Sequence, residues 1–215
     1  MNIHFSKVIP DPLASISHSS QSIWKSNFTL DNTLDKRVLL NASSGKGKTT
    51  FSNLLVGIRK DYSGNILFNN VDISSFSVED WVNIREQKIS IVHQDLQLFL
   101  NLSAIENILI KNELTQTFSI EEIEIFLKQV NLFDKKDQTV ATMSMGQKQR
   151  IAIIRALCQP FEWIILDEPF SHLDDENSKI CFDLIQNRCF EINAGFILTS
   201  LDPVEDFQFD KYLKL

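Results

Sequence analysis

The sequence predicts an α/β fold with a mostly helical subdomain inserted into it. A short apolar run, Val38-Leu39-Leu40, precedes a turn rich in glycine and serine, and residues with helical spacing follow that turn. A second apolar run, Trp163-Ile164-Ile165-Leu166, is typical of a strand that is buried on both faces of a sheet. Between the two runs, apolar residues recur at helical spacing. We therefore expect an α/β core with a helical subdomain inserted at about residues 95–147.

The turn after the first apolar run has the composition of a phosphate-binding loop. It reads Ala42-Ser43-Ser44-Gly45-Lys46-Gly47-Lys48-Thr49-Thr50. Backbone N–H groups in such a turn, and at the start of the helix that follows it, point toward an anion. In this pattern Lys48 reaches the β- and γ-phosphates, and the Thr49 hydroxyl ligates Mg²⁺. The alternative is a surface turn that contains lysine by chance, and the flanking strand and helix argue against it.

The composition disfavours several classes of protein. The 215 residues suit one large domain, and 43% of them are hydrophobic. The formal net charge of −7 disfavours DNA or RNA as a partner, since nucleic-acid-binding proteins normally carry a basic face. No stretch approaches the roughly 20 apolar residues that span a bilayer, and residues 1–7 lack the apolar centre of a signal peptide. Cys158, Cys181 and Cys189 have no metal-ligand spacing, so we expect small buried residues in a reducing cytosol.

Periodicity and turn residues divide the rest of the chain into strands and helices. Strands are expected at residues 1–9 (an edge strand), 23–30, 66–68, 89–92, 196–199 and 212–215, and helices at 80–87, 144–158 and 178–190. The helix after the phosphate-binding turn should face the core with Phe51, Leu54, Leu55 and Ile58. The strand at 89–92 would deliver His93 and Gln94 to its C-terminal end, where ligands bind in open α/β sheets. Packing is the expected role of His93.

Two carboxylates directly follow the second apolar run. Asp167 and Glu168 stand at the C-terminal end of the predicted strand, and Pro169 comes after them. At that position Asp167 would hold the Mg²⁺ shell, while Glu168 would orient and polarise an attacking water as a general base. An ordinary Asp-Glu-Pro loop is the alternative for this stretch alone. The upstream phosphate-binding turn favours the catalytic interpretation.

A further motif resembles the signature of the ATP-binding cassette (ABC) ATPases, usually Leu-Ser-Gly-Gly-Gln. Residues 142–150 contain it, and Ser144, Gly146 and Gln147 keep the family pattern. The stretch 92–99 around Gln94 is similar to the family's Q-loop, and Ser171-His172-Leu173-Asp174 is similar to its D-loop. The motifs occur in family order, and the resemblance covers nearly the whole chain. It implies one ABC-type ATP-binding domain over residues 1–215, with a P-loop NTPase core.

The resemblance also implies how the site residues divide their work. In this family two domains face each other head to tail, with ATP bound between them. Thr49, Gln94 and Asp167 would ligate Mg²⁺, Glu168 and Gln94 would act on the attacking water, and Asp174 would cross the interface near the other ATP. On the opposite subunit, the start of the signature helix would contact the γ-phosphate. The ATP-binding residues would be 42–50 of one chain and Ser144, Gly146 and Gln147 of the other.

The same resemblance implies partners and a location. A second ATP-binding subunit, identical or different, would complete the dimer. A separate transmembrane permease would dock in a groove between the core and the helical subdomain, near residues 94–100. The cofactors would be ATP and Mg²⁺. The chain would then be an ATPase subunit that lies on the cytoplasmic face of a membrane.

Two positions depart from the family pattern. Ala42 stands where the phosphate-binding loop usually begins with glycine, and its Cβ disfavours a positive φ. Ser200 stands where the family carries a switch histidine that touches the γ-phosphate. A hydroxyl can hydrogen-bond a phosphate oxygen, so Ser200 is a candidate catalytic residue, although losing the imidazole predicts hydrolysis slower by about 10²–10³-fold. For the aromatic residue that stacks on adenine, Trp24 and Phe5 are candidates, but core packing explains both.

Three functional hypotheses remain open at this point. The first is an active transporter ATPase, and residues 73–99 and 102–108 are similar to the family group that serves lipoprotein release and macrolide efflux. The second is a degenerate regulatory subunit that dimerises on ATP with little or no hydrolysis, as Ala42 and Ser200 suggest. The third is a soluble ABC ATPase that acts on nucleic acid or ribosomes, and the acidic charge argues against it.

Overall fold

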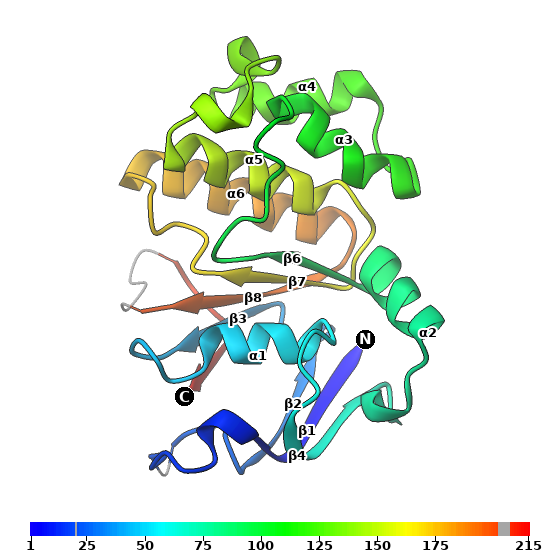
Figure 1. The fold of residues 1–215 in the computed structure, drawn as a ribbon, viewed down its shortest axis with the longest axis vertical. Helices are drawn as coiled ribbons and strands as arrows, with labels where there is room; N and C mark the ends of the chain where they lie inside the picture. The colour runs from blue at the N-terminus through cyan, green and yellow to red at the C-terminus, as the bar shows by residue number, and fades with distance from the viewer. Residues whose placement is uncertain (20, 202–206) are drawn as a thin grey trace.

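Figure 1 shows the computed structural model of the chain, which describes residues 1–19, 21–201 and 207–215. Its centre is a sheet of five parallel strands in the order β6-β7-β8-β3-β9. The predicted strands at 89–92, 163–166, 196–199 and 212–215 are confirmed within about two residues at each end. The strands of this sheet are β3 (Arg37–Asn41), β6 (Ile89–Val92), β7 (Trp163–Asp167), β8 (Gly195–Ser200) and β9 (Lys211–Lys214).

The N-terminal part of the chain makes a second, antiparallel sheet. Its strands follow the order β2 (Asn27–Asp31), β1 (Asn2–Pro10), β4 (Tyr62–Phe68) and β5 (Val71–Asp72). The prediction of an edge strand at residues 1–9 is wrong in its placement, because β1 pairs with β2 on one side and with β4 on the other. The strand expected at 23–30 begins only at Asn27, because residues 23–26 form a turn closed by a hydrogen bond from Ser26 N to Ile23 O.

Helices cover both faces of the parallel sheet. In Figure 1, α5 (Met145–Leu157) and α6 (Asp175–Glu191) lie on one face, and α1 (Lys48–Leu55) lies on the other, between the two sheets. Ahead of β6, α2 (Val78–Asn83) continues into a π-helical turn, Ile84–Lys88. The helices predicted at 80–87, 144–158 and 178–190 are therefore confirmed. Short 3-10 turns lie at Asp11–Leu13, Ile73–Ser75, Phe133–Lys135 and Val140–Thr142.

A long insertion separates two neighbouring strands of the parallel sheet. β6 and β7 are paired, but α3 (Ala104–Thr115), α4 (Ile120–Gln129) and α5 lie between them in sequence. Figure 1 shows α3 and α4 on the far side of α5, away from the sheet. Each of these three helices starts with a serine that forms a capping box, which fixes where the helix begins. No helix within the described ranges is both long enough and apolar enough to cross a membrane.

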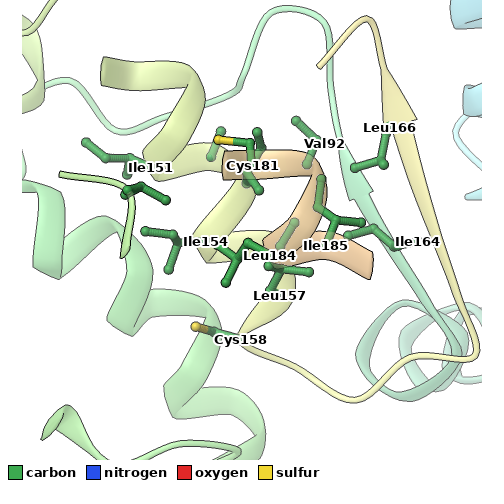
Figure 2. Packing of buried hydrophobic residues seen from close by; sticks show 14 of the residues in the cluster. Val92, Ile151, Ile154, Leu157, Cys158, Ile164, Leu166, Cys181, Leu184 and Ile185 are labelled. Carbon is green, nitrogen blue, oxygen red and sulfur yellow. The ribbon is translucent and has the colours of Figure 1, made fainter. Parts of the chain in front are cut away.

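Side chains of the parallel strands alternate between two hydrophobic clusters. Ile164 and Leu166 belong to the cluster under α5 and α6, where Figure 2 shows them with Leu184 of α6. Trp163 and Ile165 point the opposite way and pack in the cluster around α1. β7 is buried along its whole length, as predicted for a strand covered on both faces.

The three cysteines lie in the cluster under α5 and α6. Cys158, Cys181 and Cys189 are buried free thiols, and Figure 2 labels the first two. Burial raises the pKa of each thiol to about 12, so the thiols stay protonated and pack as small apolar groups. Their interpretation as core residues is confirmed.

One residue predicted to face the core does not do so. Three of the four inward positions of the first helix are buried as expected, but Ile58 is 54% exposed. The helix ends at Leu55, and Gly57 then adopts a φ of +67°. A Cβ at Gly57 would lie 2.5 Å from the Trp81 ring, so the chain turns tightly against that ring. The turn carries Ile58 off the helical face, and its predicted inward position is wrong.

The contact between β7 and β8 gives a test of core packing. Gly195 pairs with Trp163 across the two strands, and a Cβ at Gly195 would lie 2.7 Å from the Trp163 ring. Because Trp163 is fully buried, Gly195→Ala should lower the free energy of unfolding by about 1–3 kcal/mol, as measured by urea denaturation. Trp163→Phe makes room for the new methyl group, so the double variant should show favourable coupling between the substitutions. Wild-type stability of Gly195→Ala would contradict this packing.

Candidate active site

Two glycines shape the turn at residues 42–50, which is named loop 42–50. Gly45 and Gly47 have φ values of +75° and +102°, which other residues rarely adopt. A Cβ on Gly47 would also lie 2.5 Å from Leu13 Cδ1 and 3.3 Å from the Trp24 ring. The Trp24 indole N–H donates a hydrogen bond to a carbonyl oxygen of the loop at 3.2 Å. The loop therefore lies directly on the Trp24 ring, and glycine is required where they meet.

Ala42 opens the loop with an ordinary backbone conformation. It is not among the residues with a positive φ, so alanine causes no backbone strain at this position. Its N–H donates a hydrogen bond to Ser200 O at 3.2 Å, and its carbonyl oxygen accepts one from Lys48 Nζ at 2.7 Å. The backbone strain that the family pattern suggested for an alanine at position 42 is absent from this structure.

Lys48 is the cation at the centre of the loop. Its side chain is only 6% exposed, and α1 begins at this residue. The ammonium donates hydrogen bonds to Ala42 O at 2.7 Å and Ser43 O at 3.4 Å, and it lies 3.3 Å from Glu168 Oε1. The first N–H groups of a helix have no partner within the helix, so the start of α1 adds donors at the same place. Loop 42–50 thus brings a buried cation and the first N–H groups of α1 to one place, and both are groups that can bind an anion.

Side-chain hydrogen bonds join the start of α1 to the ends of two strands. Thr49 Oγ1 donates to Gln94 Oε1 at 3.2 Å, and Gln94 Nε2 donates to Glu168 Oε2 at 3.3 Å. Gln94 lies two residues past β6 and Glu168 directly follows β7, so both lie at the carboxyl edge of the parallel sheet. That edge is where α/β sheets bind ligands. The structure therefore brings these three predicted residues together.

A residue that the sequence did not single out holds Asp167. Asp167 is buried at the end of β7, and its Oδ1 accepts a hydrogen bond from Thr199 Oγ1 at 2.7 Å. The same hydroxyl accepts a hydrogen bond from Glu168 N at 3.2 Å. Thr199 faces Asp167 because β7 and β8 pair in that register. In the sequence, Thr199 stands out only through its position next to Ser200. The strand register is needed to show which carboxylate it contacts.

Gln149 is a second residue that sequence reasoning missed. It is buried on α5, where its Nε2 donates hydrogen bonds to Glu168 O at 3.1 Å and Ser171 Oγ at 3.3 Å. Its Oε1 accepts a hydrogen bond from His172 N at 3.1 Å. Gln149 therefore ties the backbone that follows Asp167 and Glu168 to α5. In the sequence, the indication for Gln149 is that it lies four residues before Ile153, which places this polar residue on the buried face of α5.

The remaining motif residues form a separate group, which consists of Ser144, Gly146, Gln147 and Asp174. At the start of α5, Ser144 Oγ accepts a hydrogen bond from Gln147 N at 3.3 Å, and Ser144 N donates one to Gln147 Oε1 at 3.0 Å. A Cβ on Gly146 would lie 2.8 Å from a backbone carbonyl oxygen ahead of α6. Asp174 caps α6, where hydrogen bonds from backbone and side chain lower the pKa of its carboxyl group. Across the described ranges, no hydrogen bond or ion pair joins this group to loop 42–50.

Ser200 lies at the edge of the same site. It ends β8 in register with Asn41, and its carbonyl oxygen accepts the hydrogen bond from Ala42 N. Asp202, the next acidic residue, is outside the described part of the chain. The predicted position of Ser200 beside the phosphate-binding loop therefore agrees with the strand register.

Both candidates for the adenine contact lie in the core. Phe5 and Trp24 are buried, and Phe5 stacks on Phe28 with ring centroids 4.5 Å apart. Phe51 packs against both, at 5.5 Å from Phe5 and 6.4 Å from Trp24. Core packing accounts for both rings, and the hydrogen bond to loop 42–50 gives Trp24 a supporting role.

The fold and the site together define a class of protein. A glycine-rich loop with a buried lysine, followed by carboxylates at the carboxyl edge of a parallel sheet, is the arrangement of a P-loop nucleoside triphosphatase. The ABC transporter family matches residues 26–171, and the chain belongs to that family. This membership confirms the predicted family and the predicted function as the ATP-binding subunit of an ABC transporter.

Individual relatives agree with this assignment. The lipoprotein-releasing system ATP-binding protein LolD of Buchnera aphidicola subsp. Schizaphis graminum is 38% identical over 167 residues, which are 76% of this chain and 72% of that protein. A dimeric structure of MJ0796, a bacterial ABC transporter cassette, matches with a TM-score of 0.78 and 23% identity, over 93% of this chain and 88% of that one. A post-hydrolysis structure of MJ0796 bound to ADP and Pi matches with a TM-score of 0.77 and 22% identity, over the same shares of the two chains. The predicted ABC-type α/β fold is thus confirmed.

Thr199 offers a test of how the carboxylates are positioned. Thr199→Val removes the hydroxyl shared by Asp167 and Glu168 N. Unpaired buried polar groups cost about 1–3 kcal/mol, so ATP turnover should fall by about tenfold to a hundredfold while ATP affinity is kept. Thr199→Ser, which retains the hydroxyl, should retain turnover. Equal turnover of the valine variant and the wild type would show that this hydroxyl does not position the carboxylates.

Proposed function

We propose that this chain hydrolyses ATP at the carboxyl edge of its parallel sheet and thereby drives a separate membrane-spanning subunit. The observation that carries the proposal is the connected set of Lys48, Glu168, Gln94 and Thr49. A cation and a hydroxyl from the start of α1, an amide from beyond β6 and a carboxylate directly after β7 meet there within hydrogen-bonding distance. Phosphate binding and water activation need these groups side by side.

Each residue of this set has a distinct task. Loop 42–50 and Lys48 hold the β- and γ-phosphates through backbone N–H groups and the ammonium. Glu168 accepts the proton of the attacking water, and Gln94, hydrogen-bonded to the same carboxylate, orients that water. Ser200 offers a hydroxyl to a phosphate oxygen from the end of β8.

We assign Mg²⁺ to the same place. Thr49, Gln94 and Asp167 supply a hydroxyl, an amide oxygen and a carboxylate, which are the hard oxygen ligands that Mg²⁺ prefers. Thr49 Oγ1 and Gln94 Oε1 already lie 3.2 Å apart. The described residues include no group of three or more His, Cys, Asp or Glu that could hold a metal, and Mg²⁺ commonly binds through one or two carboxylates together with waters and phosphate oxygens. When bound, the cation would neutralise charge on the phosphates.

The second group of motif residues acts, in this proposal, on the ATP of another subunit. Ser144, Gly146, Gln147 and Asp174 make no described contact with their own loop 42–50. The start of α5 presents helix N–H groups, which suit a phosphate. The dimeric structure of MJ0796, which has a similar fold, supports a dimer for this chain. The partner is a second ATP-binding subunit, either an identical chain or a different one.

The transporter assignment extends to a membrane partner. LolD, 38% identical to this chain, is named as the ATP-binding protein of a lipoprotein-releasing system, which supports the lipoprotein-release group. We place the chain on the cytoplasmic face of the membrane, bound to a separate permease subunit. In this proposal residues 1–215 form one ABC-type domain, and the helical subdomain at about residues 95–147 provides part of the permease contact.

Ser200 supports a second candidate function. A regulatory subunit that dimerises on ATP with little hydrolysis would not need the switch imidazole, and a serine hydroxyl cannot replace its charge. The intact Glu168, with its contacts to Lys48 and Gln94, favours the active enzyme.

Mg²⁺-dependent ATP turnover separates the two functions. The wild type should hydrolyse ATP, Glu168→Gln should abolish turnover, and Ser200→His should raise it by about 10²–10³-fold because a stronger phosphate contact is restored. Ser74→His, on the exposed 3-10 turn Ile73–Ser75 outside the site, is the control for adding a histidine. If the wild type and Ser200→His are both inactive while ATP still produces dimers, the regulatory function replaces the catalytic one.

The proposed dimer has its own test in size-exclusion chromatography. Glu168→Gln with ATP should elute as a dimer, since hydrolysis no longer separates the subunits. Adding Ser144→Arg should prevent this dimer, because the side chain would occupy the phosphate contact. Ser119→Arg is the matched control, since Ser119 forms the same kind of capping box at the start of α4. Equal dimer yields for the two arginine variants would refute the role of Ser144.

A further inference from the structure

A hollow of about 620 Å³ opens at the amino edge of the parallel sheet, opposite to the candidate active site, and is named the amino-edge pocket. Its lining comes from the turn before β3, the start of β3, the end of α6 and the start of β8. β3 begins at Arg37 in this pocket and ends at Asn41, directly before loop 42–50, so the strand separates the two places. The volume lies within the range of about 300–1,000 Å³ that is typical of small-molecule sites.

The apolar lining of the amino-edge pocket extends from the surface to the core. Leu34 and Phe190 line it at the surface and are 75% and 88% exposed. Cys189, Ala194 and Phe196 line it at the core, and none of them is more than 4% exposed. A hydrocarbon group in this hollow would remove the two exposed side chains from water, which is favourable. The combination of a buried and an exposed apolar lining fits a small molecule that enters the hollow.

The polar lining carries one cation without a carboxylate partner. Lys36 forms no ion pair with a residue in the described ranges. Its Nζ donates hydrogen bonds to Asn193 O and Asn193 Oδ1, both at 2.8 Å, and an ammonium has a third N–H donor. Arg37 differs, because its guanidinium donates to both carboxylate oxygens of Asp210, at 2.8 and 3.4 Å. Lys36 is therefore the unbalanced charge of the lining.

The neighbouring polar groups are compatible with an anion. Gln186 and Asn187 line the pocket, and their side-chain amides make no hydrogen bond with a described residue, so both can donate to a ligand. The last carbonyl oxygens of a helix would repel an anion. In α6 these oxygens are occupied, because the N–H groups of residues 192–194 donate to carbonyl oxygens of its last turn at 2.8 to 3.2 Å. Among the described residues, the lining thus offers free donors and no unpaired carboxylate.

We propose that the amino-edge pocket binds a small amphipathic carboxylate, with its hydrocarbon part between Leu34 and Phe190 and its carboxylate on Lys36. Charge complementarity supports the anion, because hydrogen bonds between an ammonium and a carboxylate are stronger than neutral ones. The volume and the apolar lining support the hydrocarbon part. The proposal goes beyond the proposed function and does not depend on it, since the pocket shares no residue with loop 42–50 or with the Asp167-Glu168 pair.

Three probes with one hydrocarbon chain test the chemistry of this site. Octanoate carries the carboxylate, octan-1-ol is neutral and octylammonium has the opposite charge. By isothermal titration calorimetry on the full-length chain, octanoate should bind at least about tenfold more tightly than octan-1-ol, and octylammonium most weakly, because only octanoate can pair with Lys36. Absence of octanoate binding, or equal affinities for the three probes, would overturn the proposal.

Matched variants test the two ends of the ligand. Lys36→Gln should weaken octanoate binding by at least about tenfold and leave octan-1-ol binding unchanged, whereas Lys36→Arg should keep both. Lys135→Gln removes the charge of an exposed lysine outside the pocket and should have no effect. Phe190→Asp should abolish octanoate binding, and Ile125→Asp, at a 51% exposed position on α4, is its control. Wild-type affinity of Lys36→Gln or of Phe190→Asp would contradict the proposed pose.

Photo-cross-linking locates the site. An octanoate analogue with a diazirine at the end of its chain should form an adduct within residues 34–37 or 186–196, as identified by mass spectrometry. A non-hydrolysable ATP analogue should leave this adduct unchanged, because β3 separates the pocket from loop 42–50. An adduct on loop 42–50, adducts scattered over the surface, or displacement by the nucleotide analogue would overturn the proposal. ATP turnover, measured separately, decides the proposed function and has no bearing on this result.

Discussion

The position of the Lys48 ammonium is the constraint on which the rest of the site depends. A buried cation needs polar partners, and Lys48 finds them in the carbonyl oxygens of Ala42 and Ser43 and in the Glu168 carboxylate. Loop 42–50 follows β3 and Glu168 follows β7. Because Lys48 contacts Glu168, β3 and β7 must end at the same level along the strand direction. β8 lies between them and pairs with both in parallel register, which sets that level. The hydrogen bonds of Gln94, Asp167 and Thr49 follow from the same alignment.

The sequence was sufficient where consecutive residues carry the chemistry. Loop 42–50 and the Asp167-Glu168 pair could be predicted because each motif contains its own strand end and turn. Thr199 and Gln149 could not, because their roles arise only when distant segments pair or pack. Hydrophobic periodicity shows which face of an element is buried, but it does not show which partner covers that face.

The same reasoning explains the errors in the fold. Weak alternation at residues 1–9 is compatible with an edge or an interior strand, and only pairing with β2 and β4 decides between them. Ile58 continued the helical spacing, but the positive φ of Gly57 ends the pattern one residue earlier. At Ala42 the motif suggested a backbone cost, and the observed conformation removes it. In each case the local backbone or the partner strand overrides a pattern that was correctly identified.

The end of β6 connects a surface groove with the candidate active site. His93 lines a groove of about 370 Å³ along β6, whereas the next residue, Gln94, forms hydrogen bonds with Thr49 and Glu168 in the candidate active site. Since packed interiors transmit displacements rather than absorb them, a displacement at the groove end of β6 would reach the Gln94 amide and its hydrogen bonds. Coupling between this groove and the hydrogen bonds of Gln94 then needs no long pathway, because adjacent residues face the two places. Mutations that loosen the end of β6 would weaken this coupling and leave the phosphate-binding loop intact.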